Sequence, residues 1–314
     1  MFLIINMRKS NGKINRIWGY IVNLLQIEIF VKVVDMGNFT RAGEVLAMTQ
    51  SGISHNIASL ESELGITLLN RGRNGISLTD SGERIIKHMR NILTEAESIK
   101  QETASILGIQ NGKINIGSFS SFSSKVLPTI ISRFRGEFKG IEINFYEGSY
   151  DQITRWVEEG KVDIGFTSLS NPLDHLETIP ILSDRLVLTL PIHHHLAING
   201  QVKVEDLQGE AFIMPKLGCE VGVMKFLKEQ EVSPNIQFNV EDNQTIIAMV
   251  REGLGITIMP ELALPYNLQG TLVKPIFPEP SREISIITRS KKQSLPAVKA
   301  FIKTTIDCMK DLQL

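Results

Sequence analysis

Five polar residues near position 50 and two arginines near position 72 are the side chains of this sequence best suited to reading a nucleic acid. Hydroxyl, amide and imidazole groups can exchange hydrogen bonds with base edges in a major groove. The polar residues are Gln50, Ser51, Ser54, His55 and Asn56, directly preceded by Thr49. Arg71 and Arg73 would reach phosphates or the minor groove, and Arg41 is a further candidate contact.

Two short helices joined by a tight turn must position these side chains. Thr40 is a good N-cap for a first helix over residues 41–47, in which small and apolar residues share one face. A second helix is capped by Thr49 or Ser51 and ends at Gly65. Its buried face consists of Ile53, Ile57, Leu60 and Leu64, at spacings of four, three and four. This pattern is typical of a helix-turn-helix, although an ordinary helical hairpin with a solvated face would share it.

Residues 68–79 read as two short extended pieces around a turn rich in glycine and asparagine, with both arginines near its tip. A winged helix has such a hairpin, in which arginines fix register on the DNA more than they specify sequence. The alternative is a solvated hairpin with two surface arginines. Charge does not decide, because residues 22–79 hold four basic residues against five acidic ones.

A long helix is expected from residue 80 to about residue 110, where Thr79 or Asp80 can cap it and Glu83 can complete a capping box. Its apolar and small positions alternate at spacings of four and three without a slip, which favours packing against a partner helix. They are Ile85, Met89, Ile92, Ala96, Ile99, Thr103 and Ile106. The stripe could instead pack on the C-terminal part of the same chain.

From residue 111 onward, short strands alternate with helices, which predicts an α/β fold with mainly parallel sheets. The expected strands are residues 113–117, 141–146, 162–167, 186–190, 211–214 and 255–259. The expected helices are residues 128–138, 152–159, 222–229, 245–252 and 296–309.

Open α/β sheets bind ligands at the carboxyl ends of their strands, so the polar residues there outline a candidate site. Hydroxyls and backbone N–H groups at a helix start suit a carboxylate or another oxyanion. The candidates are Ser118, Ser120, Ser121, Thr167 and Ser168, with Met214 and Lys216 at the end of a later strand. Each hydroxyl could equally cap a helix or a turn.

Other chemistry has weaker support. His193, His194 and His195 invite a metal site, but consecutive residues point in different directions and only two could converge on one ion. We therefore expect a solvated turn there and no metal. Cys219 lies near an expected helix start and could sense oxidants, yet no resolving cysteine lies near it in sequence, so a buried or bystander thiol is the other reading. The familiar phosphate-binding, dinucleotide-binding, zinc-protease and nucleophile motifs do not occur, so we expect neither enzyme activity nor a cofactor.

The composition is that of a soluble globular protein with room for two or three domains, at 314 residues, 42% hydrophobic and 21% charged. Two cysteines far apart in sequence fit a reducing cytosol and exclude a disulfide framework. No apolar run could span a bilayer, and in residues 1–21 a short apolar run precedes the basic residues, unlike a secretion signal.

The N-terminal part of the sequence resembles the LysR-type transcriptional regulators, and the resemblance extends more loosely to the end of the chain. It rests on Ala42, Leu46, Gln50, Ser54, Ile57, Leu60-Glu61, Leu64-Gly65, Leu68, Arg71, Leu78-Thr79 and Gly82. Gly43, Ser51 and Leu69 stand where the family usually has Ala, Pro and Phe, which bears on the operator sequence rather than on the activity. Residues 1–21 lie outside the family pattern, so we hypothesise an overlong start, with Val22 as the true initiator.

The resemblance implies a winged helix-turn-helix over residues 22–79, a linker helix over residues 80–110 that pairs two subunits, and an effector-binding domain over residues 111–314. It sharpens the last to two lobes like those of type 2 periplasmic binding proteins. The first lobe would be about residues 111–183 plus 288–314, and the second about residues 184–287. In the family, the loops that carry Ser118, Ser120, Ser121, Thr167 and Ser168 face the cleft between the lobes, and Lys216 is a looser match.

The function that this resemblance implies is regulation of transcription in the cytoplasm, without a membrane partner. The protein would bind double-stranded DNA at an interrupted inverted repeat as a dimer or tetramer. A small effector, with anions among the candidates, would modulate that binding or the bend of the DNA. A transported-solute receptor would instead need an export signal and no winged helix, and an α/β enzyme would need a catalytic constellation.

Overall fold

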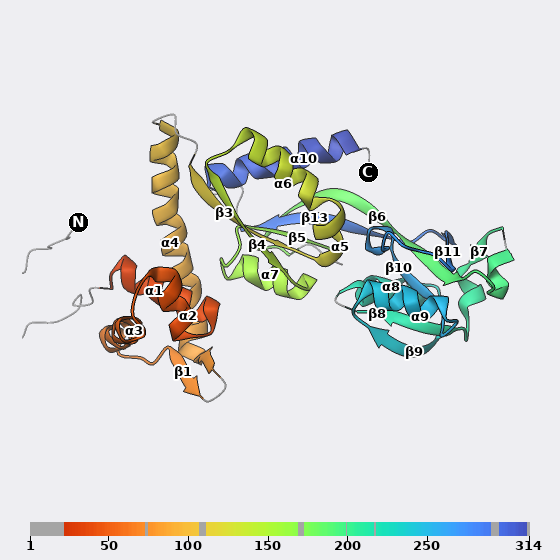
Figure 1. Ribbon diagram of the computed structural model, residues 1–314, viewed down its shortest axis with the longest axis horizontal. Coiled ribbons are helices and arrows are strands. Elements are labelled where there is room, and N and C mark those ends of the chain that lie inside the picture. The colour runs from red at the N-terminus through yellow and green to blue at the C-terminus, as the bar shows by residue number, and fades with distance from the viewer. Residues whose placement is uncertain are drawn as a thin grey trace, which may run out of the picture. The chain divides into compact units, whose positions relative to one another are not determined.

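The computed structural model describes residues 22–72, 75–106, 111–168, 173–198, 200–216, 218–289 and 295–312 (Figure 1). The chain forms two compact units, one ending at Leu93 and the other beginning at Thr94. The hypothesis about residues 1–21 and the candidate contact Arg73 lie outside the described residues. Among the helices that the structure describes, none combines the length and apolar character that crossing a bilayer requires.

The first unit consists of three helices and a hairpin, followed by the start of a long helix. The helices are α1 (Leu24–Met36), α2 (Phe39–Leu46) and α3 (Gln50–Leu64). The antiparallel strands β1 (Leu69–Gly72) and β2 (Gly75–Leu78) form the wing. The winged helix-turn-helix predicted from the sequence is therefore confirmed.

Side-chain caps start these helices, as expected, but not always at the residue predicted. Asn38 caps α2 by accepting from the backbone N–H groups of Thr40 and Arg41, at 2.7 and 3.3 Å. The prediction of Thr40 was wrong by two positions, because Asn38 takes that role two residues earlier. Of the two predicted caps of α3, Thr49 and Ser51, the structure shows Thr49, whose Oγ1 accepts from the N–H of Gly52 at 3.1 Å.

The core of the first unit is completed by the beginning of α4 (Asp80–Ile106). Ile86 and Met89 are buried with Phe30, Ile53 and Leu60. Gly82, in the first turn of α4, lies so close to the wing that only glycine fits: a Cβ there would lie 2.3 Å from the carbonyl oxygen of Leu68.

The predicted pairing seam on α4 therefore needs a correction. Met89 is 4% exposed and Ile85 packs on the same core, so the fold of the first unit already uses both side chains. Ile92 and Ile99 are 45% and 68% exposed and stay open to a partner. Ala96 is half-buried, Thr103 is exposed, and the side chain of Ile106 lies outside those described.

The second unit begins with a lobe built on parallel strands (Figure 1). β3 (Gly112–Ser118) pairs in parallel with β4 (Ile141–Glu147) and with β5 (Ile164–Thr167). Helices α6 (Leu127–Glu137) and α10 (Pro296–Leu312) cover one face of this sheet, α7 (Tyr150–Glu158) covers the other, and α5 (Ser120–Lys125) follows β3. Phe122, Phe134, Phe166 and Phe301 fill the core of this lobe.

Two long antiparallel strands connect this lobe with a second one. β6 (Glu177–Pro191) pairs with β13 (Ser281–Thr288), and β13 also pairs antiparallel with β5. Toward its end, β6 pairs antiparallel with β10 (Thr257–Pro260) and β11 (Thr271–Lys274). The sheet is therefore mixed, which corrects the prediction of mainly parallel sheets. Ile284 and Ile286 of β13 lie in the first lobe's core. The chain therefore returns from the second lobe to the first before the predicted boundary at residue 287.

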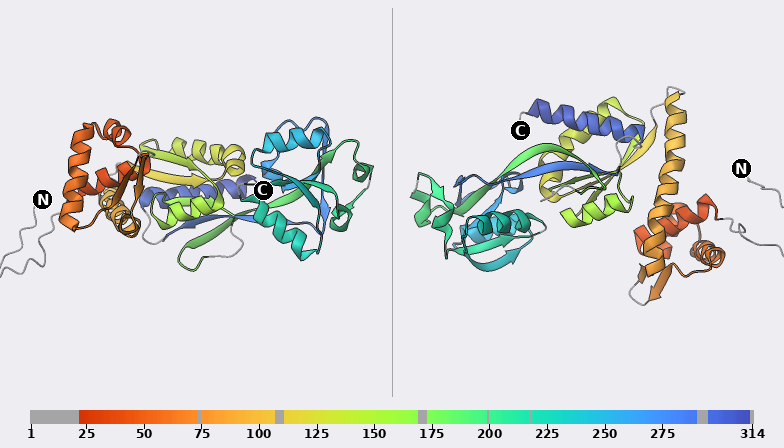
Figure 2. Two further views of the ribbon diagram at one scale, coloured as in Figure 1. Left: turned by 90° about the horizontal axis from the view of Figure 1, so that it is seen from below. Right: turned by 180° about the vertical axis from the view of Figure 1, so that it is seen from behind.

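The second lobe places helices on both faces of its sheet (Figure 2, left). β8 (Ala211–Pro215) and β9 (Asn235–Val240) are parallel, with α8 (Cys219–Glu229) and α9 (Asn243–Arg251) on opposite sides. Its remaining elements are η1 (His195–Ile198), β7 (Val202–Lys203), η2 (Val204–Leu207), η3 (Glu261–Ala263) and β12 (Ile276–Phe277). The predicted two-lobed α/β architecture is confirmed.

Candidate functional site

The N-terminal half of α3 presents the residues predicted to read bases. Gln50, Ser51 and His55 are exposed, whereas Ser54 and Asn56 are half-buried. A polar, exposed helix start of this kind can enter a major groove, where its first residues meet base edges.

Two of these side chains are held by their own helix. Ser51 Oγ lies 3.1 Å from Thr49 Oγ1, and Asn56 Nδ2 donates to the carbonyl oxygen of Gly52 at 2.9 Å. Among the described residues, Gln50 and His55 have no side-chain hydrogen bond, so their polar atoms are available to a base without loss of an internal contact.

Glu61 links the reading helix to the wing. Its Oε1 accepts from the backbone N–H groups of Leu68 and Leu69, at 2.7 and 3.1 Å. Its Oε2 lies 3.6 Å from Nη2 of Arg71, whose guanidinium is also 5.3 Å from the ring centroid of Phe39. The Arg71 side chain is 46% exposed, so it can reach a phosphate while Glu61 and Phe39 hold its orientation. The sequence interpretation treated Glu61 as a motif residue and missed this role.

Arg41 completes the described part of this surface. It is exposed in the first turn of α2, on the chain segment just before the reading helix. A cation there is suited to a phosphate rather than to a base edge.

A cavity of about 610 Å³ lies between the two lobes of the second unit. The first lobe contributes the starts of α5 and α7, and the second contributes the starts of α8 and α9 and the loop after η3. Its polar and charged lining includes Ser120, Ser121, Ser124, Lys125, Glu147, Ser149, Gln152, Lys216, Glu241, Asp242, Asn243, Gln244 and Tyr266.

The structure brings only some of the predicted effector residues into this cavity. Ser120, Ser121 and Lys216 line it, and their role in effector binding stays a prediction. Ser118 and Thr167 are fully buried and do not line it, and among the described residues neither hydroxyl oxygen has a hydrogen-bond partner. They are the last residues of β3 and β5, and the residues that follow them, Phe119 and Ser168, line two different cavities.

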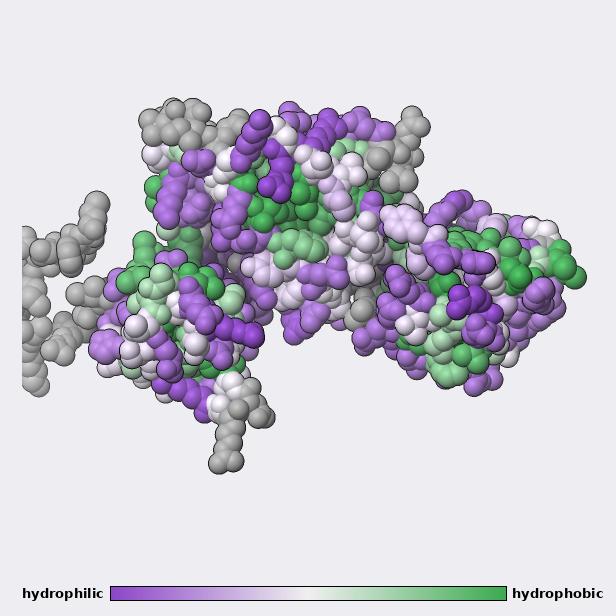
Figure 3. Space-filling view, viewed as in Figure 1, coloured by the Kyte–Doolittle hydropathy of each residue, from purple (hydrophilic) through white to green (hydrophobic). Residues whose placement is uncertain are grey.

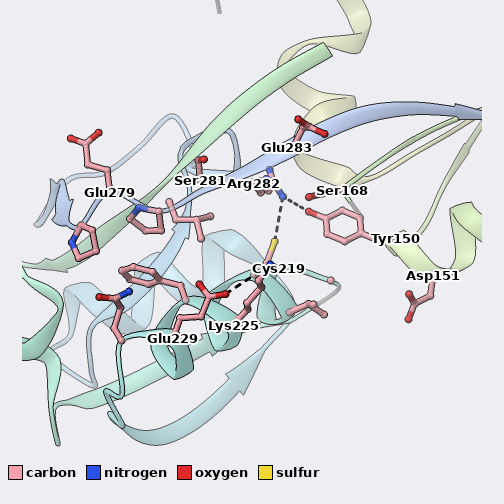
Figure 4. Close-up of a pocket in the computed structure, with 18 residues that line it drawn as sticks. Tyr150, Asp151, Ser168, Cys219, Lys225, Glu229, Glu279, Ser281, Arg282 and Glu283 are labelled. Atoms are coloured by element: carbon pink, nitrogen blue, oxygen red, sulfur yellow. Dashed lines mark hydrogen bonds and ion pairs between the residues drawn. The ribbon is translucent and has the colours of Figure 1, made fainter. Parts of the chain in front are cut away.

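The other two predicted residues lie elsewhere. Met214 is 1% exposed in the core of the second lobe, because its side chain points to the inner face of β8. Ser168 lines a second cavity of about 490 Å³ (Figure 4). The assignment of Met214 to the cleft is therefore corrected. Ser168 lies in a cavity that residues of both lobes line, and its role in effector binding stays a prediction.

A buried arginine, Arg282, lines the second cavity and contacts Tyr150 and Cys219, which line both cavities. Arg282 Nε and Nη2 donate to Oδ2 of Asp184 at 2.9 and 2.6 Å, and Nη2 also donates to Oγ of Ser121 at 3.0 Å. Nη1 is hydrogen-bonded to the hydroxyl of Tyr150 and lies 3.8 Å from Sγ of Cys219 (Figure 4). The group therefore joins the first lobe, the second lobe and both connecting strands.

The side chains around Arg282 keep their protons: the pKa values of the Cys219 thiol and the Tyr150 hydroxyl are both raised. Burial raises the pKa of the Cys219 thiol, and the neighbouring Arg282 cation offsets this only in part. Burial raises the pKa of Tyr150 in the same way. A neutral thiol is a poor nucleophile, so the environment of Cys219 is that of an inert side chain. Arg282 and Tyr150 were not singled out from the sequence.

Each of the two parts of the chain matches a known protein family. Residues 24–83 match the family described as "Bacterial regulatory helix-turn-helix protein, lysR family". Residues 108–307 match the family described as "LysR substrate binding domain".

Similar proteins include a sequence relative and two solved structures. YvbU of Bacillus subtilis (strain 168), an uncharacterized HTH-type transcriptional regulator, is 31% identical over 90% of this chain and 97% of its own length. Full-length OxyR from Pseudomonas aeruginosa has a TM-score of 0.73 at 20% identity, covering 92% of this chain and 95% of that chain. The effector binding domain of QuiR in complex with shikimate has a TM-score of 0.58 at 22% identity, covering 64% of this chain and 98% of that chain.

The two structural likenesses show the fold. The family models, which together match both units, and the relative at 31% identity show the family. With a helix-turn-helix in one unit and a cleft between two lobes in the other, the chain belongs to the LysR family of transcriptional regulators.

Proposed function

We propose that the cavity between the lobes binds a small anionic effector and that its occupancy changes how the protein holds its operator. The observation that carries the proposal is a half-buried cation at the cleft. Lys216 lines the cavity and, among the described residues, has no carboxylate or hydrogen-bond partner for its ammonium group. An unpaired ammonium group that is partly removed from water is stabilised when a ligand supplies a negative charge beside it.

The surrounding elements support an anion at the same place. The helices α7, α8 and α9 all begin at this cavity, and helix starts carry a partial positive charge. Lys125 adds a second cation, packed 3.5 Å from the ring centroid of Tyr266.

Three carboxylates also line the cavity and oppose an anion. Glu147, Glu241 and Asp242 are all exposed, so water screens them, and Asp242 is engaged as the cap of α9. We therefore expect the anionic group of the effector to lie by Lys216 and Ser121, away from these rim carboxylates.

Two structural relatives support the binding of a small molecule. QuiR was solved with shikimate, and the regulatory domain of Synechocystis CcmR was solved with 2-PG. We extend from them only that a domain of this fold can bind a small molecule.

On the DNA side, the proposal assigns base reading to Gln50, Ser51, Ser54, His55 and Asn56. Arg41 and Arg71 would hold phosphates, and the helix start at Thr49 would face the backbone. The exposed Ile92 and Ile99 of α4 would meet a second copy of the chain, which doubles the contacts. We propose that the protein acts in the cytoplasm on DNA and has no catalytic activity.

Calorimetric titration of the full chain tests the effector proposal. The panel pairs small carboxylates and phosphate esters with the neutral amide or methyl ester of each. We expect saturable binding of at least one anion and none of its neutral counterpart. Lys216→Met should weaken that binding about 10- to 100-fold, the effect of losing one charged hydrogen bond.

Lys228→Met is the matched control, because Lys228 is exposed on α8 and lines neither cavity. A neutral ligand bound as tightly as its anion, or an unchanged affinity in Lys216→Met, would contradict the proposal. Footprinting of the DNA beside its own gene, with and without the ligand, then tests the link to the operator.

A further inference from the structure

Two histidines and a glutamate converge on one point of the second lobe, away from the cleft. His194 Nε2 lies 3.4 Å from Oε2 of Glu210, and His195 Nε2 lies 3.2 Å from Oε1 of the same carboxylate. The ligand atoms of the three residues all lie within 4.8 Å of one another. The sequence interpretation, a solvated turn, is therefore incomplete, because the two neighbouring rings do meet a third ligand from another segment.

The fold prepares this convergence. His194 and His195 stand where β6 ends and η1 begins, and Glu210 directly precedes β8. Lys274 of β11 donates to the carbonyl oxygens of Leu196 and Ala197, which ties the histidine-bearing turn to the sheet. Because two segments of the chain supply the ligands, an ion here would link the end of β6 to the start of β8.

The donor set is two imidazole nitrogens and one carboxylate. Zn²⁺ takes this set with four-coordinate geometry, and three protein ligands leave one position for water. Ni²⁺ and Cu²⁺ also bind imidazole, whereas Mg²⁺ and Ca²⁺ prefer oxygen ligands. We propose that His194, His195 and Glu210 form a binding site for a divalent transition-metal ion, with Zn²⁺ as the best match.

Access and protonation are compatible with binding. His195 is 64% exposed and Glu210 is 23% exposed, so an ion can enter from solvent and still find a partly desolvated carboxylate. Burial and the neighbouring His195 lower the pKa of His194, and a neutral ring is the form that coordinates.

Binding has one identifiable cost. The backbone N–H of Leu196 donates to Nδ1 of His194 at 3.3 Å, which places the ring proton on Nε2. Coordination through Nε2 moves that proton to Nδ1, so the amide loses its acceptor. The hydrogen bond given up is long, and the amide is at the start of a 3-10 turn, where an unpaired N–H is common.

Titration of the untagged full-length protein with ZnCl₂ tests the site. We expect one saturable equivalent per chain, and Glu210→Gln and His195→Ala should each weaken binding at least about tenfold. Loss of even a supporting partner of a metal ligand has that effect. His193→Ala is the matched control, because His193 is the exposed neighbour in the same turn and lies outside the cluster.

Co²⁺ provides the second measurement. Its visible bands should appear without a thiolate charge-transfer band, which separates this site from Cys219 and Cys308. Equal metal-free melting temperatures of the variants and the wild type would show that they fold. Absence of saturable binding, or equal loss in His193→Ala and Glu210→Gln, would overturn the proposal.

Discussion

Arg282 and Asp184 stand directly opposite each other on antiparallel strands and form a buried ion pair, with 2.6 Å between Nη2 and Oδ2. Their side chains are 6% and 2% exposed. The pair lies where β13 and β6 run between the lobes, and the same guanidinium contacts Ser121 of the first lobe and Cys219 of the second. The orientation of the two lobes therefore depends on the positive charge of Arg282, which the carboxylate of Asp184 neutralises.

Arg282→Met tests this dependence. Removing one partner leaves a buried, uncompensated carboxylate, so the free energy of unfolding should fall by about 3–5 kcal/mol. The double variant Arg282→Met/Asp184→Leu should recover most of that loss, because no charge remains to be desolvated. Urea titration of the full chain measures both. A single variant within about 1 kcal/mol of the wild type would contradict the assigned role of the pair.

The wing and the reading helix should fail in different ways when mutated. Arg71→Ala should weaken binding to all DNA sequences alike and lower the salt slope by about one, because Arg71 is proposed to contact phosphate. His55→Ala should change the preference among operators and leave the salt slope nearly unchanged, since His55 is exposed on α3. Fluorescence anisotropy at several salt concentrations, on operator and unrelated duplexes, separates the two. Identical behaviour of both variants would refute the division of roles.

Ile92→Lys should abolish self-association and operator binding together. Ile92 is 45% exposed on α4, and a lysine in a helix-pairing seam lowers the stability of the pair. Glu95→Lys is the control, because it places the same lysine side chain on an exposed position outside the predicted stripe, with an even larger change of net charge. Analytical ultracentrifugation gives the oligomeric state. An Ile92→Lys protein that still self-associates would show that the seam lies elsewhere.

Local patterns in the sequence predicted the local structure well. The spacing of Ile53, Ile57 and Leu60 placed the buried face of α3, and Gly65 ended it in the left-handed conformation. These features depend on neighbours within one or two turns. The cap of α2 was misplaced because Asn38 and Thr40 are both good caps, and only the chain path decides between them.

Long-range partners could not be predicted. Arg282 and Asp184 are separated by 98 residues, and nothing near either residue indicates the other. Met89 has the spacing of a pairing residue, yet it is buried in the core of the first unit. One continuous apolar stripe can pack on this core at its start and leave its later residues open to another helix. Ser118 and Thr167 end their strands as expected, but one position along the strand decides whether a hydroxyl lines a cavity, as at Ser168, or is buried, as at Thr167.

The cap of α9 should make stability depend on pH in the acid range. Asp242 Oδ1 accepts from the backbone N–H and the hydroxyl of Thr245, at 2.8 and 2.7 Å, and these hydrogen bonds lower the pKa of Asp242 below its ordinary 3.8. A carboxyl whose folded pKa is lowered stabilises the fold fully above its unfolded pKa and loses that contribution as pH falls through the folded pKa. Asp242→Ala should therefore lower the free energy of unfolding by about 1 kcal/mol at neutral pH, and the difference from wild type should shrink below pH 3.8. Urea midpoints at pH 7 and at about pH 3 measure this, with Glu241→Gln as the exposed neighbour that caps nothing. If the deficit of Asp242→Ala persisted unchanged in acid, the ionised carboxylate would not be what stabilises the start of α9.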